Sequence, residues 1–367
     1  MISQQAEVGG TDGERVAGME VMTVLGRVPA AQLGITLVHE HLVMDTRRVL
    51  DRIHRYDSEA VSGLPHPAEA RWNPGAFRDN YDLSDPALCI EDLKPLRDTV
   101  PTVVDCTPMD IGRDPLALKT VAAETGIRVV MGSGWYLHGV RSAEHRKMTA
   151  EEMSDLLVQE FRAGVDDTQV RPGIIGELGT SSPVDDEEFK ALHAAATASL
   201  QTGLAVSAHL HPWSKHGIEV VSALRDSGLP MEKLILNHLT TAHNDPAYQD
   251  KLLQAGCYLA FDLFGFDHSL LTAGRYPPSD YDVAVNIVRL VRAGHATRLL
   301  ISQDIGVRTR LRAFGGWGYG HLTDHVVPLL SQLGLTEAEL KTILVANPAR
   351  VLAIPPTNGL AQQAGSR

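Results

Sequence analysis

The chain has 367 residues, of which 44% are hydrophobic and 21% are charged, the balance of a folded globular protein rather than a disordered one. Its formal net charge of -12 argues against nucleic acid as a partner, because phosphate binding needs a basic surface. No stretch approaches the roughly 20 apolar residues of a membrane span, and no secretory signal is predicted. Three cysteines are too few for a disulfide scaffold, which favours the cytoplasm.

The two ends of the chain differ from its middle in composition. Residues 1–18 are polar and rich in glycine, and residues 355–367 are also polar, so both are predicted to be flexible. Residues 19–354 are expected to form a single domain. Length alone would allow two domains, but α/β barrels of this length commonly form one.

The first elements are a short strand predicted at residues 21–28 and a longer one at residues 35–41, which ends in the sequence His-Glu-His. Residues 47–81 include Gly63, Pro65, Pro67 and Pro74 and show no sustained hydrophobic period. They are predicted to form a long irregular loop after the first long strand. Long loops in compact domains are usually functional.

From residue 85 onward the sequence alternates between apolar stretches with helical spacing and short runs of Val, Ile and Leu. Together with the strand at residues 35–41, strands are predicted at residues 102–106, 127–136, 173–181, 204–213, 234–241, 257–265 and 298–306. Helices are predicted at residues 116–125, 151–163, 186–203, 217–227, 246–256, 283–294, 323–333, 336–344 and 348–352.

Eight short, apolar strands that alternate with helices predict a parallel sheet covered on both faces. Eight such strands close a barrel, so the predicted fold class is α/β, a (β/α)8 TIM barrel. A doubly wound open sheet is the alternative. It would be expected to carry a GxGxxG phosphate loop after an early strand, and the sequence has none there.

Polar residues at the C-terminal ends of the strands are the candidates for an active site in such a barrel. The eight barrel strands are counted from the one predicted at residues 35–41. His39 and His41 lie on one face of this first barrel strand, because side chains alternate along a strand. The candidates at the ends of strands four, five, six and eight are Glu177, His209, His238 and Asp304. A single histidine after a strand is usually a core or loop residue, but four imidazoles and two carboxylates together are typical of a two-metal site.

Several segments of the chain resemble the phosphotriesterase-related family of the amidohydrolase superfamily. They are LGITLVHEHL, VDCTPMDIGRDP, GSGWY, GIIGELGTS, GGWGYGH and ILVANPARV, and the likeness extends from about residue 21 to residue 354. The resemblance implies metal-dependent hydrolysis of a small-molecule substrate by a (β/α)8 barrel, often a homodimer.

The resemblance also implies a role for each of the six candidates: His39, His41 and Asp304 would hold a buried metal, His209 and His238 a more exposed one, with Glu177 as the bridge. Many relatives have a carboxylated lysine at the bridging position. This chain has glutamate there, as in other branches of the family. The implied cofactors are two divalent metal ions, with zinc expected first and manganese, cobalt or iron as alternatives.

In the implied mechanism, Asp304 is the catalytic residue. It would orient a hydroxide shared by the two metals and carry its proton to the leaving group, although a role as ligand alone is the alternative. The candidates for substrate binding are Tyr136, His211, Trp213, Arg308 and Trp317, which follow strands three, five and eight. Tyr136 resembles a pocket tyrosine of lactonase relatives, with simple packing as the alternative. Arg308 would suit an anionic group, with surface pairing as the alternative.

The predicted reaction is attack on the carbonyl of a lactone, carboxylic ester or amide. Hydrolysis of organophosphate triesters is one alternative, and the residues do not separate the two because the same metals serve both. A non-catalytic barrel that binds a small molecule is another, which the complete ligand set argues against. A mononuclear deaminase of the same superfamily is a third, and Glu177 argues against it because such enzymes generally lack this bridging carboxylate.

Overall fold

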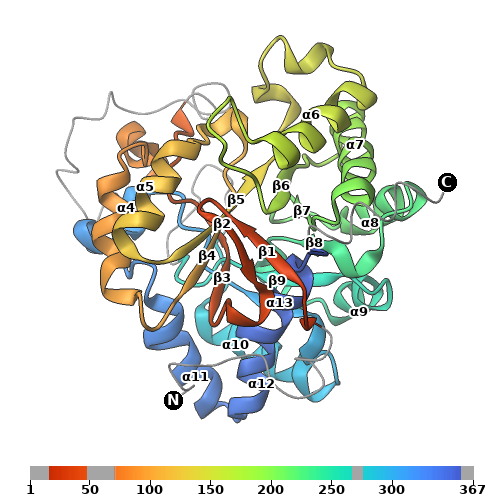
Figure 1. Cartoon of the computed structure of the whole chain (residues 1–367). Coiled ribbons are helices and arrows are strands. Elements are labelled where there is room, and N and C mark those ends of the chain that lie inside the picture. Colours follow the sequence, from red (N-terminus) through yellow and green to blue (C-terminus); the bar gives the residue numbers. More distant parts are fainter. Residues whose placement is uncertain (1–15, 48–69, 71, 267–275, 357–367) are drawn as a thin grey trace.

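Eight parallel strands form the centre of the protein in a computed structural model, which describes residues 16–47, 70, 72–266 and 276–356. The strands follow the order β10-β9-β8-β7-β6-β5-β4-β3, and the two outer strands of this order also contact each other. The sheet is therefore a nearly closed barrel, and helices surround it (Figure 1). The prediction of a (β/α)8 TIM barrel is confirmed.

All eight predicted barrel strands are present and almost entirely buried. Their bounds are β3 (Thr36–Glu40), β4 (Thr102–Asp105), β5 (Arg128–Ser133), β6 (Ile174–Gly179), β7 (Val206–His209), β8 (Leu234–Leu236), β9 (Tyr258–Phe261) and β10 (Leu299–Ile301). Each is shorter than its prediction, because the apolar runs continue into the loops that follow the strands.

The helices lie close to their predicted positions. Their bounds are α4 (Pro86–Leu93), α5 (Pro115–Thr125), α6 (Ala150–Ala163), α7 (Asp186–Thr202), α8 (Gly217–Asp226), α9 (Pro246–Gln254), α10 (Asp280–Arg292), α11 (Val327–Gln332), α12 (Glu337–Lys341) and α13 (Asn347–Leu352). A capping box at Thr149 opens α6, and Gly126 in the left-handed region ends α5. The helices predicted at 323–333 and 336–344 are only partly α-helical, because each contains a π-helical turn, at Leu322–Val326 and Thr342–Ala346.

The single strand predicted at residues 21–28 is wrong. The structure has an antiparallel hairpin of β1 (Glu20–Thr23) and β2 (Gly26–Pro29). The chain reverses at Val24 and Leu25, and Gly26, the first residue of β2, has a φ of 118° that is readily adopted only by glycine. The backbone N–H of Val24 donates to the carbonyl of Val129, near the start of β5, so the hairpin covers the N-terminal end of the barrel (Figure 1).

The described chain is packed at both of its ends. Val16 is buried, and the carbonyl of Pro355 accepts a hydrogen bond from Arg27. Residues 1–15 and 357–367, which make up most of the predicted flexible ends, lie outside the described residues, as do residues 48–69 and 71 of the predicted long loop. The rest of that loop includes two short 3-10 turns, Pro74–Ala76 and Arg78–Tyr81.

One cluster of buried apolar side chains fills the barrel and the space between strands and helices. Within the part of the chain that the structure describes, no helix is long and apolar enough to cross a membrane.

A buried ion pair ties α6 to the barrel and gives a test of the fold. Glu160 accepts hydrogen bonds from both terminal nitrogens of Arg113, at 2.8 and 2.6 Å, and one from Ser133. The substitution Glu160→Ala leaves the guanidinium buried without its carboxylate, so we expect the free energy of unfolding to fall by about 3 kcal/mol. Urea denaturation measures this loss. Gln159→Ala, at an exposed position of the same helix, is the control; equal losses in the two variants would contradict the prediction.

Candidate metal centre

The six predicted ligand residues come together at the C-terminal end of the barrel. His39 is in β3 and His41 follows that strand directly, while Glu177 is in β6. His209 is the last residue of β7, and His238 and Asp304 lie just beyond β8 and β10. The parallel strands carry these side chains to one end of the sheet, which is where barrel enzymes place their active sites.

The Glu177 carboxylate lies in the middle of the four imidazoles. Its Oε2 atom is 3.1 Å from Nδ1 of His209, 3.3 Å from Nε2 of His39 and 3.5 Å from Nε2 of His238. Its other oxygen, Oε1, is 3.5 Å from Nε2 of His41. The carboxylate therefore has contacts with histidines of both predicted metal positions.

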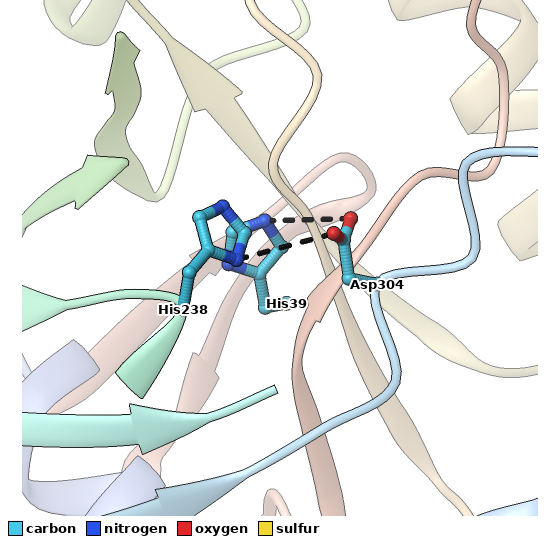
Figure 2. Close-up of side chains that lie close together, drawn as sticks. All are labelled: His39, His238 and Asp304. Atoms are coloured by element: carbon cyan, nitrogen blue, oxygen red, sulfur yellow. Dashed lines mark ion pairs between the residues drawn. The ribbon is translucent and has the colours of Figure 1, made fainter. Parts of the chain in front are cut away.

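Asp304 closes the cluster on the side of β10. Its Oδ1 atom is 3.1 Å from Nε2 of His41 and 3.8 Å from Nε2 of His39, and its Oδ2 is 4.0 Å from Nδ1 of His238. Figure 2 shows both oxygens directed at His39 and His238. The Asp304 side chain is 18% exposed, compared with 3% for Glu177, so Asp304 is the carboxylate that solvent and a substrate can reach.

Two of the six residues have unusual backbone conformations. His238 has a φ of 63° and Asp304 a φ of 53°, in the left-handed region that residues other than glycine seldom adopt. Such conformations are retained where the surrounding structure fixes them, and they are concentrated at functional sites.

The spacing of the nitrogen and oxygen atoms fits divalent cations. Three groups have ligand atoms within 4.8 Å of one another: His39 with His41 and Glu177; Glu177 with His209 and His238; and His39 with His238 and Asp304. Ligands at about 2.1 Å from a tetrahedral zinc ion lie roughly 3.4 Å from each other, close to the separations around Glu177. In addition, neither ring nitrogen of the fully buried His39 makes a hydrogen bond of normal geometry.

The histidines and carboxylates of the cluster shift one another's pKa values. Burial lowers the pKa of His41, but Asp304 and Glu177 raise it to about 9. Burial also lowers the pKa of His209, and there the lowering prevails. Burial raises the pKa of Glu177 and of Asp304, yet the imidazoles hold both pKa values below their usual range. The carboxylates are thus ionised at neutral pH, and a bound metal would displace protons from the histidines.

A further carboxylate, Asp262, supports two of the imidazoles from behind. Its oxygens are 3.1 Å from Nδ1 of His39 and 3.2 Å from Nδ1 of His238, which leaves Nε2 of each ring directed at Glu177. Thr107 does the same for His41, with its hydroxyl 2.9 Å from Nδ1. Partners of this kind fix the tautomer and orientation of a ligand histidine.

Asp262 was not among the predicted site residues, although its position in the sequence indicates it. Asp262 directly follows β9, so the rule that identified the other candidates also applies to it. No candidate was taken from that strand.

The five predicted substrate-binding residues have different surroundings in the structure. The Tyr136 hydroxyl is 3.5 Å from Nε2 of His209, at the centre itself. His211 is exposed and Trp213 half-buried, both shortly after β7. Trp317 is 46% exposed and stacks on His321. Arg308 forms an ion pair with Asp82 at 3.2 Å, so it would have to leave that carboxylate to bind an anionic substrate.

A (β/α)8 barrel with four imidazoles and two carboxylates at the C-terminal ends of its strands has the architecture of a metal-dependent hydrolase. The chain belongs to the phosphotriesterase family, whose model matches residues 19–352. This family depends on a binuclear metal centre.

Known proteins are similar over almost the whole chain. The human N-acetyltaurine hydrolase is 33% identical over 344 residues, which are 91% of this chain and 97% of that protein. The crystal structure of a resiniferatoxin-binding protein from Rhodobacter sphaeroides has a TM-score of 0.86 and 36% identity, over 91% of this chain and 94% of the other. The crystal structure of a mutant of a PTE-like lactonase from Deinococcus radiodurans has a TM-score of 0.73 and 26% identity, over 90% of this chain and 99% of the other. The prediction of a metal-dependent hydrolase is confirmed.

The position of Asp262 gives a test of the site. In Asp262→Asn only one oxygen remains, so the side chain no longer presents a carboxylate oxygen to each of the two imidazoles. We expect the affinity for divalent metal to fall about 10- to 100-fold, as is typical when such a supporting partner is lost. Competition with a chelator of known affinity measures this change. Asp114→Asn, an exposed helix cap on α5, is the control; metal affinity equal to that of the control would refute the supporting role.

Proposed function

We propose that the protein hydrolyses the amide bond of small N-acylated amino acids or amino sulfonates at a binuclear metal centre. The observation that carries this proposal is the position of Glu177, within 3.5 Å of all four histidines. The similar N-acetyltaurine hydrolases, whose name denotes cleavage of an amide, support the choice of bond.

The six residues have the roles that the resemblance implies in this proposal. His39, His41 and Asp304 would hold one divalent cation, His209 and His238 the other, and Glu177 would bridge them in place of a carboxylated lysine. Four imidazoles favour zinc among the common divalent ions. When bound, the cations supply Lewis acidity and lower the pKa of water.

Asp304 is the proposed proton acceptor. Its carboxylate is ionised, partly exposed and in contact with His41, so it can take a proton from the attacking water and pass it to the departing amine. Tyr136 lies next to His209. Burial raises the pKa of Tyr136 well above its usual value, so its hydroxyl stays protonated and is able to donate a hydrogen bond to the substrate.

The other predicted substrate-binding residues are assigned to the pocket because of the loops in which they lie. We propose that His211 and Trp213 after β7, and Trp317 after β10, line the pocket, and that Arg308 binds an anionic end when Asp82 releases it. The cytoplasmic location, which the low cysteine content favours, and the homodimer, which the resemblance implies, are part of the same proposal.

Two other functions have support among the relatives. Lactone hydrolysis is supported by the similar Deinococcus lactonase, and non-catalytic binding of a small molecule by the similar resiniferatoxin-binding protein. Turnover distinguishes them: a binding protein holds its ligand without cleaving it.

Metal content tests the centre. We expect purified protein to contain about two divalent ions per chain, since two cations are needed for the proposed site. Glu177→Ala should lose most of this metal, because the carboxylate contributes to both positions. Elemental analysis of dialysed protein measures both quantities, with Glu151→Ala on the exposed face of α6 as control. One ion or none in the wild type, or unchanged content in Glu177→Ala, would contradict a bridged pair.

Turnover tests the reaction. We expect the metal-loaded enzyme to cleave N-acetyltaurine or N-acetylated amino acids faster than lactones, aryl esters or phosphotriesters. Asp304→Asn should lower kcat by about 10²- to 10⁴-fold, because a positioned proton acceptor contributes this much. Steady-state kinetics on the five substrate classes give these values, and metal content is measured on the same samples. Faster cleavage of lactones would favour a lactonase, and cleavage of none a binding protein.

A further inference from the structure

The barrel has a seam between its first and last strands. Neighbouring strands from β3 through to β10 are joined by ladders, but within the described residues no ladder joins β10 back to β3. The seam is nevertheless closed at its C-terminal end, immediately beside Asp304. The backbone N–H of Asp304 donates to the carbonyl of His39 at 3.0 Å, and that of His39 donates to the Ser302 hydroxyl, also at 3.0 Å.

Glu40, between the two ligand histidines of β3, makes most of the remaining contacts across the seam. Its Oε1 atom accepts hydrogen bonds from the Ser302 hydroxyl at 2.7 Å and from the Gln303 backbone N–H at 2.9 Å. Its Oε2 atom accepts one from the Ile305 backbone N–H at 3.0 Å. The two backbone donors are the residues on either side of Asp304, so this fully buried carboxylate holds both neighbours of Asp304.

Arg310 binds the carbonyl groups of the same segment. One terminal nitrogen, Nη1, donates to the carbonyls of Gln303 and Asp304, the latter at 2.8 Å, and the other, Nη2, donates to the carbonyl of Phe264 after β9. The segment from Gln303 to Ile305 is therefore held through its N–H groups by a buried carboxylate and through its C=O groups by a buried guanidinium. Asp304 has its left-handed backbone conformation at the centre of this segment.

We propose that Glu40 is a positioning residue for Asp304: its carboxylate takes the place of the missing strand ladder and fixes the Asp304 side chain against His41. This inference rests on the proposed role of Asp304 as proton acceptor. A glutamate that served only to close the barrel would need no contacts on both sides of one reactive residue. His39 and His41 point into the site, and Glu40 between them points to the seam, because side chains alternate along a strand. The same strand therefore supplies two of the proposed ligands and the residue that supports a third, Asp304.

The test compares Glu40→Gln with Asp92→Asn. Glutamine has a single acceptor oxygen, so it cannot satisfy all three donors. Asp92 is also a buried carboxylate, and it accepts two backbone hydrogen bonds, from the N–H groups of Arg312 and Tyr319. Both donors lie in the chain that follows β10, as Asp304 does. Loss of the Asp92 carboxylate should affect stability without changing the segment around Asp304.

The first measurement is hydrogen exchange of the backbone amides of Gln303 and Ile305 in metal-free protein. In Glu40→Gln we expect exchange at least about tenfold faster, because a hydrogen bond to a charged acceptor is lost. The second measurement is kinetic. We expect kcat to fall about 10- to 100-fold with KM almost unchanged, while the enzyme still binds metal. Asp92→Asn should change neither quantity.

Unchanged exchange at the two amides would overturn the proposal, as would faster exchange with the kcat of the Asp92→Asn control. If Glu40→Gln does not fold, Ser302→Ala removes one donor and should produce a smaller effect in the same direction on both measurements; no effect on either would overturn the proposal as well. A wild-type protein without metal or amidase activity would refute the proposed function, whereas the exchange data would still show whether Glu40 holds this segment.

Discussion

Buried negative charge is the constraint on which the C-terminal end of this barrel depends. Glu177, Asp262 and Asp304 are brought together there with little access to water, and isolated carboxylates in such surroundings would be strongly destabilising. The imidazoles compensate them: every one of these carboxylates lies within 4 Å of at least two histidine rings. Without metal, protons on the histidines balance the charge, and divalent cations would balance it when bound.

The fold meets this constraint with side chains from six strands and the loops directly after them. Alternation along β3 sends His39 and His41 into the site and Glu40 to the seam, so a single tripeptide supplies two candidate ligands and closes the barrel. The left-handed conformations of His238 and Asp304 turn the chain immediately after β8 and β10, which brings both side chains back over the barrel end. These arrangements belong to the loops, whereas the strands supply a rigid base for them.

The barrel and the six candidate ligands could be predicted from the sequence because both depend on local patterns. Strands and helices have distinct hydrophobic periods. In a parallel barrel, polar residues at the C-terminal ends of the strands all lie at the same end of the barrel. The turn at Val24 and Leu25 was missed because both of its residues are apolar, so the apolar run of the hairpin continues through it. The partner of Arg308 was not predictable either, since Asp82 is 226 residues away in sequence and a guanidinium at a loop position can pair with any nearby carboxylate.

The fixed position of Asp304 bears on which bond the enzyme cleaves. An amine is a poor leaving group until it receives a proton, so amide hydrolysis requires a group that first accepts a proton from water and then delivers it to nitrogen. A lactone makes a weaker demand, because its alkoxide is a better leaving group. Asp304 is held by His39 at its N–H, by Arg310 at its carbonyl and by Glu40 through both neighbours. A carboxylate restrained this closely, with 18% of its side chain exposed, suits the proposed amide hydrolysis.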